Sequence, residues 1–560
     1  MKEVVLFLSA LTMLNAQTTN WDQLIDRYFD QAVFPFNPSG ATQNGIHQWD
    51  QQLEDFSAAA VARQTTLLNQ FEKQVAAFPA SQPDRDLVLA NIRSTRFALQ
   101  SIRMWEKNPD QYSSAASSAA FVIMSRAFAP PDVRLRALIA REKQMPKLFQ
   151  DARANLKNPP RLYTEVAIEQ LPGIVSFFEK DVPLAFKDVR DPDLLRDFNA
   201  SNATVIRELR DYEAWLKTSL LPRSKGDYRI GAENYRNKLK YDDMVDLPLD
   251  RLLEIGMSDL RKNQQAFRET ARRIDPSKTP EQILEAAEKD HPAPDKLLQS
   301  FTDTLDGLRQ FISSRHIAGI PSQVLPTVEE TPPFMRALTF ASMDTAGPYE
   351  KVAKDAFFNV TLPEKNWPAK EVEEHMAAFN RGVITSTAIH EAYPGHYLQA
   401  LWLNATPQSK ARLLIGANTF IEGWAHYCEQ MMLDEGYGDG DLSLRLGQLQ
   451  DALLRNARYI VGIQLHTGKM TYEQGVDFFV KEGFQTRTNG KRETKRGASD
   501  PTYLYYTLGK LQILKLREDY KALRGRDFTL EEFHNKLLSQ GMGPIKLMRR
   551  ALLGNDSPVL

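Results

Sequence analysis

The segment HEAYPGH at residues 390–396 constrains the local fold more than any other stretch of this chain. Its two histidines are six residues apart, and on an unbroken α-helix their rings would point about 120° away from each other. In the HExxH pattern the spacing is four, so both imidazoles face one metal and the glutamate reaches a bound water. A regular helix across residues 390–396 therefore could not bind one metal through both histidines.

Pro394 and Gly395 provide a way to break that helix. Proline lacks the N–H that would bond the carbonyl four residues back, and glycine tolerates backbone angles closed to other residues. We predict that two residues bulge out here, so that His390 and His396 converge with Glu391 beside them, because local helix distortions are frequent at functional sites. The alternative is that Pro394-Gly395 simply ends a helix and the histidines cap or line a turn.

A second acidic segment, FIEGWAHYCE at residues 420–429, is predicted to be a helix in which Glu422 lies among apolar neighbours. An ionised carboxylate is costly to desolvate unless it is paired or binds a metal. Two histidines and one glutamate leave an open position for water, which is the pattern of catalytic rather than structural zinc sites. We therefore predict that His390, His396 and Glu422 bind Zn²⁺, although the same ligands accept manganese, cobalt or nickel. The alternative is a surface glutamate paired with a nearby lysine or arginine.

The strings HEAYPGHYLQ and EGWAHYCEQMMLDEGYG resemble the bacterial family catalogued as domain of unknown function 885. Further matching segments extend along most of the chain: residues 45–50, 228–231 with 233 and 235, 290–292, 458–459 with 465–466, 496 and 506–509. That family in turn resembles helical zinc peptidases of the gluzincin group, such as the carboxypeptidase Taq and angiotensin-converting enzyme families. The resemblance implies a mainly α, multi-helical, two-lobed fold with a deep cleft and at most a small β element. Those relatives keep the shorter HExxH, so this chain departs from them at the proposed metal ligands.

Hydrophobic spacing agrees with a helical protein. Val88, Ile92, Leu99, Ile102 and Trp105 recur at intervals typical of one helix face, and few stretches alternate like strands. Residues 339–361, rich in aromatic and small side chains, are predicted to include one short sheet edge. With 560 residues, 42% of them hydrophobic and 25% charged, the chain can bury a large core and is expected to form more than one domain or lobe.

The predicted organisation has three parts. Residues 1–16 are interpreted as a signal peptide, residues 17–235 as an N-terminal helical half, and residues 236–560 as a catalytic half carrying both motifs. The passage between the halves is predicted within residues 222–236, where glycine and proline interrupt the helical pattern.

The first residues predict export to the periplasm or the outside of the cell. Lys2 precedes an apolar run over residues 4–14, and the small residue Ala16 follows where cleavage is expected. The run is too short for a membrane span, and no other stretch approaches the roughly 20 apolar residues that a span needs. No cysteine follows the run, so no lipid anchor is expected there. The alternative is an ordinary buried N-terminal helix.

Charge excludes some partners. The 70 lysines and arginines nearly cancel the 71 aspartates and glutamates, so no global field favours nucleic acid or an anionic membrane surface. The expected partner is a peptide substrate, and the oligomeric state is not predicted. Cys428 is the only cysteine, which excludes an intrachain disulfide, and we expect it to be buried in the Glu422 helix. His426 shares the face of Glu422 and is expected to contact the metal ligands or to pack.

Glu391 is the expected general base. A water on the metal loses much of its proton affinity, and Glu391 is placed to accept its proton and pass it to a leaving amine. The charge that develops on the carbonyl oxygen needs a donor opposite the metal. By resemblance to helical zinc peptidases, where a tyrosine and a histidine polarise the carbonyl, Tyr506 and His466 are favoured. The alternatives are a core tyrosine with a satisfied hydroxyl and a histidine that caps a helix end.

Arg458, Arg496 and Tyr503 are predicted to contact substrate. A guanidinium fits a carboxylate in fork geometry, so an arginine clamp on a chain terminus would imply an exopeptidase. The run KRETKR at residues 491–496 is equally typical of an exposed, solvated segment.

Two functions from different classes remain open at this point. The first is an exported zinc-dependent peptidase that hydrolyses peptide bonds. The second is a secreted helical protein that binds peptides or another ligand and keeps a catalytically silent metal site. The presence of Glu391 favours the first, since a purely binding site does not need a carboxylate beside the ligands.

Overall fold

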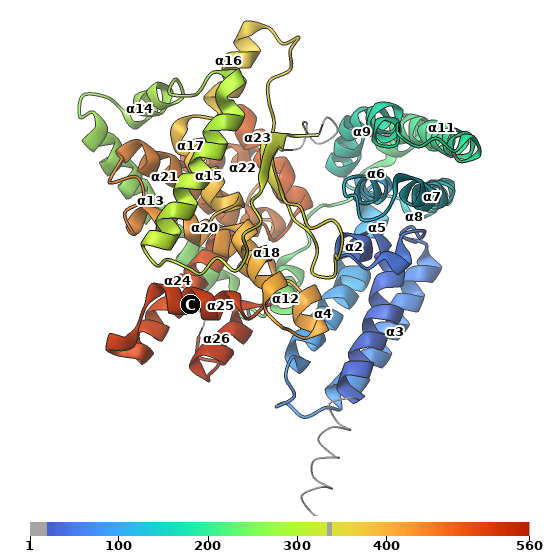
Figure 1. The fold of residues 1–560 in the computed structure, drawn as a ribbon, viewed down its shortest axis with the longest axis horizontal. Coiled ribbons are helices and arrows are strands. Elements are labelled where there is room, and N and C mark those ends of the chain that lie inside the picture. Colours follow the sequence, from blue (N-terminus) through green and yellow to red (C-terminus); the bar gives the residue numbers. More distant parts are fainter. Residues whose placement is uncertain (1–19, 333–335, 337–338, 559) are drawn as a thin grey trace, which may run out of the picture. The chain divides into compact units, whose positions relative to one another are not determined.

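The computed structural model describes residues 20–332, 336, 339–558 and 560. The predicted signal peptide lies outside them. The fold is mainly α-helical with one small three-stranded sheet, which confirms the predicted fold class (Figure 1). No helix within the described residues combines the length and the apolar character that crossing a membrane requires.

The chain forms two compact units, and their sequence boundaries interleave. The first unit contains the described residues up to Lys225 together with two short returns, Gly347–Ala353 and Gln408–Ile415. The second unit contains Gly226–Ala346, Lys354–Pro407 and Gly416–Leu560. The sequence predicted a simple division into residues 17–235 and 236–560. It did not predict that Gly347–Ala353 and Gln408–Ile415 return to the first unit.

The first unit consists of helices. The longest helix that begins and ends within its described residues, α11 (Pro192–Trp215), starts where the Asp191 side chain accepts hydrogen bonds from the backbone N–H groups of Asp193 and Leu194. This N-cap satisfies donors that have no partner within the helix. Residues 20–28 are helical, and further α-helices of the unit are α2 (Pro38–Gln43), α3 (Ala58–Ala76), α4 (Arg85–Phe97), α5 (Met104–Lys107), α6 (Asp110–Met124), α7 (Pro131–Glu142), α8 (Met145–Asn155), α9 (Arg161–Ser176), α10 (Val182–Ala185) and α19 (Lys410–Leu414). Short π and 3-10 segments join them at Phe29–Val33, Phe34–Phe36, His47–Trp49, Ala98–Ile102, Phe177–Asp181, Leu216–Leu220 and Leu221–Arg223.

The second unit carries both sequence motifs and the sheet. Its α-helices are α12 (Ala232–Asp242), α13 (Leu249–Ile274), α14 (Pro280–Ala287), α15 (Leu297–Ser314), α16 (Ala369–Ala377), α17 (Arg381–Glu391), α18 (His396–Ala405), α20 (Asn418–Asp434), α21 (Leu442–His466), α22 (Tyr472–Lys481), α23 (Arg487–Ser499), α24 (Tyr505–Arg524), α25 (Leu530–Leu538) and α26 (Ile545–Leu553). The 3-10 turns Pro294–Lys296 and Gly525–Asp527 also belong to it.

The sheet consists of β1 (Thr327–Glu330), β2 (Ala341–Asp344) and β3 (Phe357–Val360) in the order β1-β3-β2. β1 is parallel to β3, with Thr327 opposite Phe357, and β2 is antiparallel to β3, with Ala341 opposite Val360. β2 is therefore an edge strand, and it packs against α17. β2 and β3 both lie within the segment 339–361.

Two close helix crossings place the site-bearing helices of the second unit. Where α17 crosses α21, a Cβ on Gly447 would lie 2.7 Å from the carbonyl carbon of Gly382. Where α20 crosses α24, a Cβ on Gly509 would lie 1.7 Å from the carbonyl oxygen of Thr419, and Gly423 faces Gly509. Any side chain at these positions would push the backbones apart, so glycine sets how closely α20 and α21 approach their partners.

Candidate metal centre

The helix breaks at the Pro-Gly pair. Helix α17 ends at Glu391 and α18 begins at His396, with a cis peptide bond between Tyr393 and Pro394. The backbone N–H of Gly395 donates to the carbonyl of Ile389 at 3.0 Å, six residues back rather than four, and Leu398 donates to Ala392 across the same interval at 3.2 Å. Two residues are thus looped out between two helices, instead of bulging from one continuous helix as the sequence predicts.

The loop fits only with glycine at position 395. A Cβ there would lie 1.8 Å from the carbonyl oxygen of His390. Helix α20 holds the loop from the other side, because the indole N–H of Trp424 donates to the Pro394 carbonyl at 2.8 Å. The break is therefore fixed by packing as well as by the local sequence.

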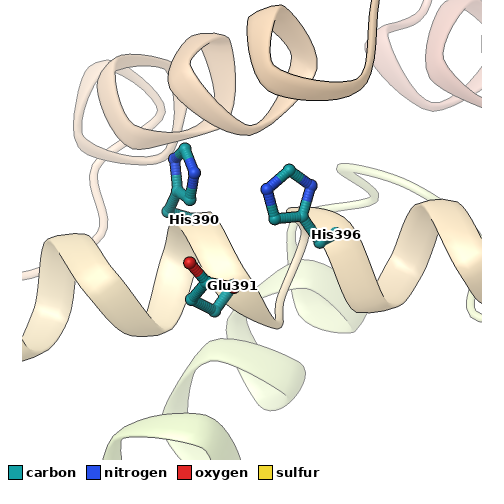
Figure 2. A group of neighbouring side chains, drawn as sticks. All are labelled: His390, Glu391 and His396. Carbon is teal, nitrogen blue, oxygen red and sulfur yellow. The ribbon is translucent and has the colours of Figure 1, made fainter. Parts of the chain in front are cut away.

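The loop brings the two imidazoles together. Figure 2 shows the rings of His390 and His396 projecting to the same side of the break, with Glu391 at the end of α17. Their centroids are 4.8 Å apart and the ring planes lie at 83° to each other. Glu391 offers a carboxylate oxygen within 4.8 Å of a nitrogen of each histidine.

Glu422 on α20 completes the group. Its Oε2 lies 3.3 Å from His390 Nε2 and 3.4 Å from His396 Nε2. Ligands about 2.0–2.1 Å from a tetrahedral zinc ion are separated from one another by roughly 3.3–3.4 Å, so these atoms are spaced like the ligands of one metal. The same Oε2 is buried and has no hydrogen-bond partner among the described residues. A buried oxygen without a partner is costly, and a cation between the three atoms would satisfy it.

The charges of the group are strongly coupled. Burial opposes ionisation of Glu422, but the adjacent imidazoles of His390 and His396 hold its pKa well below the usual value. Burial also lowers the pKa of His390, yet Glu422 and Glu429 outweigh it and raise this pKa to about 9. The two carboxylates therefore favour a positive charge at the position where the imidazoles meet.

Glu429 is a functional candidate that the sequence analysis missed. It is fully buried, and its Oε1 accepts a hydrogen bond from His390 Nδ1 at 2.6 Å. A carboxylate on Nδ1 fixes the proton there and leaves the Nε2 lone pair for a metal. Its spacing in the sequence could have identified it, because residues 422, 426 and 429 lie on one face of an apolar helix and Glu429 therefore faces the same way as the candidate ligand Glu422.

Two further groups hold Glu429. His426 Nδ1 lies 3.0 Å from its Oε2, and the Arg455 guanidinium of α21 lies 2.9 Å from its Oε1. Burial lowers the pKa of His426 to about 3, so this imidazole is neutral at neutral pH. His426 therefore contacts Glu429, which in turn holds the candidate ligand His390. The sequence left open whether His426 supports the ligands in this way or only packs in the core. Cys428 is fully buried in the same helix, as predicted.

Tyr506, in the first turn of α24, lies beside the group. Its ring centroid is 6.2 Å from that of His390, and the guanidinium carbons of Arg455 and Arg458 lie 5.4 and 5.2 Å from its ring centroid. Burial and the nearby Glu422 raise the pKa of Tyr506, so its hydroxyl keeps its proton. The hydroxyl accepts a hydrogen bond from Arg496 at 3.2 Å and still has a proton to donate.

The other predicted residues are placed differently. Arg458 makes two hydrogen bonds of 2.7 and 3.0 Å to buried Glu493, so its fork geometry is already used inside the protein. Tyr503 is fully buried. His466 is also fully buried, with Nε2 2.7 Å from the Gly497 carbonyl oxygen. It lies eleven residues beyond Arg455 on α21, which is roughly 16 Å along a helix. The structure does not bring Tyr503 or His466 into contact with the group.

Comparison with known proteins finds relatives of unknown function. A family model described as a bacterial protein of unknown function, DUF885, matches residues 38–552. A solved structure titled as a "putative lipoprotein of unknown function" from Shewanella oneidensis is 25% identical, with a TM-score of 0.80, and the match covers 95% of this chain and 99% of that one. A "putative lipoprotein" from Colwellia psychrerythraea has the same fold at 18% identity, with a TM-score of 0.79 and coverage of 95% and 98%. No curated protein matches the chain significantly.

Proposed function

We propose that this chain, which belongs to the DUF885 family of bacterial proteins, is a zinc-dependent peptidase that hydrolyses peptide bonds. The observation that carries the proposal is the convergence of His390 Nε2, His396 Nε2 and Glu422 Oε2 at distances of 3.3 and 3.4 Å. Three neutral or anionic ligands with an open fourth position are the donor set of catalytic zinc. The resemblance to gluzincin peptidases forms part of the same proposal.

In the proposed reaction, Glu391 and Glu429 have different roles beside the metal ligands. A zinc ion bound there would supply Lewis-acid polarisation of a carbonyl and a water of lowered pKa. Glu391, next to both histidines but farther from them than Glu422, takes the proton of the attacking water and passes it to the leaving amine. Glu429 holds His390 in the ligating tautomer and orientation.

Tyr506 and Arg496 are assigned to the substrate. The Tyr506 hydroxyl donates to the carbonyl oxygen as charge develops on it. Arg496, exposed and bonded to that hydroxyl, meets a carboxylate of the peptide. Arg458 holds the Tyr506 ring through its pairing with Glu493 and does not itself bind substrate.

Export forms part of the proposal. The apolar run after Lys2 is typical of a signal peptide, and the two structural relatives carry the word lipoprotein in their titles. We infer that the enzyme acts in the cell envelope or outside the cell.

The test combines metal analysis with turnover. Purified wild-type chain and Glu391→Gln are assayed for bound metals by mass spectrometry and for cleavage of a broad peptide mixture. We expect about one zinc per chain in both forms, and a loss of cleavage of roughly 10²–10⁴-fold in the variant. Metal without cleavage in the wild type would favour the alternative, a binding protein with a silent site. Absence of any bound metal after zinc loading would reject the proposal.

A further inference from the structure

Helix α23 carries five basic residues, and its three arginines differ in whether they form ion pairs with acidic side chains. Arg487, in the first turn, lies 2.7 Å from Asp477 and 3.2 Å from Glu473. Arg492 and Arg496 form no ion pair with any residue in the described part of the chain. Both are exposed, so two guanidinium groups remain available to an external anion.

The two unpaired arginines lie between the metal centre and the sheet. Arg496 donates to the Tyr506 hydroxyl, and Tyr506 lies beside the His390 ring. Arg492, one turn earlier, places its guanidinium carbon 5.6 Å from the ring centroid of Phe340. Phe340 directly precedes the edge strand β2, which packs against α17. The same helix face thus connects the candidate ligands to the start of the edge strand.

The spacing of side chains on this helix face is similar to the spacing of side chains along an extended peptide. Residues four apart on a helix have Cβ atoms about 5–6 Å apart. In an extended peptide, side chains two residues apart lie on one face and are separated by roughly 6.4–6.8 Å. Two arginines at positions 492 and 496 can therefore meet two carboxylates at positions i and i+2 of an extended chain, whereas adjacent carboxylates would point to opposite faces.

The Phe340 ring adds to the selectivity for anions. It covers one side of the Arg492 guanidinium without supplying an opposite charge, and it is itself 42% exposed. One Arg492 N–H donates to the side-chain oxygen of Asn489 at 2.7 Å, and the remaining donors of a guanidinium held over an aromatic face stay available to a planar carboxylate. The net charge of the chain is −1, so attraction of an acidic peptide must come from this local surface.

We propose that Arg492 and Arg496 form an anion-recognition surface that selects extended peptides with acidic side chains two residues apart. This substrate class rests on the peptidase function proposed above. It makes Arg492 a specificity-determining residue and extends substrate recognition from the metal centre along α23.

The first experiment measures binding without turnover. Glu391→Gln protein loaded with zinc is titrated with fluorescein-labelled hexapeptides containing Asp-Xaa-Asp, Asn-Xaa-Asn, Lys-Xaa-Lys or adjacent Asp-Asp, and anisotropy gives the Kd. We expect the Asp-Xaa-Asp peptide to bind at least about tenfold more tightly than the other three, as expected for charge-assisted hydrogen bonds. The preference should weaken at high salt because exposed charges are screened.

Charge reversal supplies the matched comparison. In the Glu391→Gln background, Arg492→Glu should remove the preference for Asp-Xaa-Asp and favour Lys-Xaa-Lys, while Arg492→Gln should remove the preference without reversing it. Arg487→Glu changes the same charge at the other end of the helix and should leave the order of the four peptides as it was. Circular dichroism checks that each variant is folded.

The outcomes separate the two proposals. Equal Kd values for acidic and neutral peptides, or an acidic preference that survives Arg492→Glu, would overturn the recognition surface. Cleavage of peptides by the wild type without an acidic preference would leave the peptidase proposal intact and reject this one. An Arg492-dependent preference in a protein that never cleaves peptides would reject the peptidase and support the surface as a binding site.

Discussion

Two histidine–carboxylate clusters, one in each unit, differ in what their histidines can still bind. In the first unit, His47 has both ring nitrogens engaged, with Nδ1 3.1 Å from Asp50 and Nε2 3.1 Å from Glu350. In the second unit, His390 has one nitrogen on Glu429, and its other nitrogen points to Glu422 Oε2 together with His396. The first arrangement is a closed ion pair, whereas the second gathers donor atoms around one point.

Sequence spacing explains part of this difference. His47 and Asp50 are one turn apart, so their pairing is local, and Glu350 reaches them from the return Gly347–Ala353. The candidate metal group instead needs three helices, because α17, α18 and α20 each contribute one candidate ligand. The pairing of His47 with two carboxylates stabilises the fold. The convergence of donor atoms from three separate helices instead forms a candidate metal-binding site.

Removal of one histidine from each cluster should give the largest contrast. We expect His396→Ala to lose nearly all bound zinc, because two ligands rarely hold a catalytic ion, while His47→Ala keeps about one zinc per chain. Metal content after dialysis against a weak chelator measures both. Equal zinc content in the two variants would break the comparison.

Glu429→Gln should have the next largest effect. The variant keeps the shape of the side chain but loses the charge that orients His390, so zinc affinity should fall by roughly 10–100-fold. Competition with a fluorescent zinc chelator measures the Kd. Glu435→Gln, an exposed carboxylate at the end of the same helix, serves as the control and should leave the affinity as in the wild type.

Trp424→Phe should have a smaller effect on the metal centre. It removes the N–H that holds the Pro394 carbonyl and leaves that oxygen only the weak Cys428 thiol donor at 3.8 Å, which should cost about 1–2 kcal/mol of unfolding free energy. Trp402→Phe is matched, because the Trp402 indole also donates to a backbone carbonyl, that of Gly319, in the same unit. Both should destabilise the protein in urea, but only Trp424→Phe should also weaken zinc binding. A parallel loss of zinc affinity in Trp402→Phe would show that general stability, and not the loop, controls the site.

The smallest effect concerns pH and the His47 cluster. Burial lowers the pKa of His47, but Asp50 and Glu350 outweigh it, so the folded-state pKa lies above the usual value. The stability from charged His47 is therefore fully present below about pH 6.5 and is lost as the pH rises through the folded-state pKa. Because a third of the side chain is exposed, we expect roughly 0.5–1 kcal/mol.

Urea unfolding of wild type and His47→Gln at pH 5.5 and pH 8.5 measures this effect. The wild type should be more stable than the variant at pH 5.5, and the gap should narrow at pH 8.5. A gap that widens with rising pH would mean that His47 is neutral in the folded protein.

Local chemistry in the sequence predicted much of the arrangement of side chains at the candidate metal centre. The Pro394-Gly395 break, the pairing of His390 with His396 and the addition of Glu422 all followed from residue types and spacing. The form of the break did not, because a bulge and a two-helix junction use the same residues and differ in long-range packing, here the hydrogen bond from Trp424. Glu429 was missed for a related reason, since a glutamate in an apolar helix does not reveal which histidine it meets.

The sequence alone determined that this chain is helical and that its helix must break between residues 390 and 396, because periodicity and backbone chemistry act over a few residues. Only the tertiary structure decided which downstream side chains stand beside the ligands. Tyr506 and Tyr503 were both predicted to reach the substrate, yet Tyr506 lies beside the His390 ring while Tyr503 is fully buried. Arg458 and Arg496 look equally available, but the partner of Arg458, Glu493, lies on a different helix and neutralises it. Such distinctions depend on how closely helices pack, and short-range sequence patterns do not contain that information.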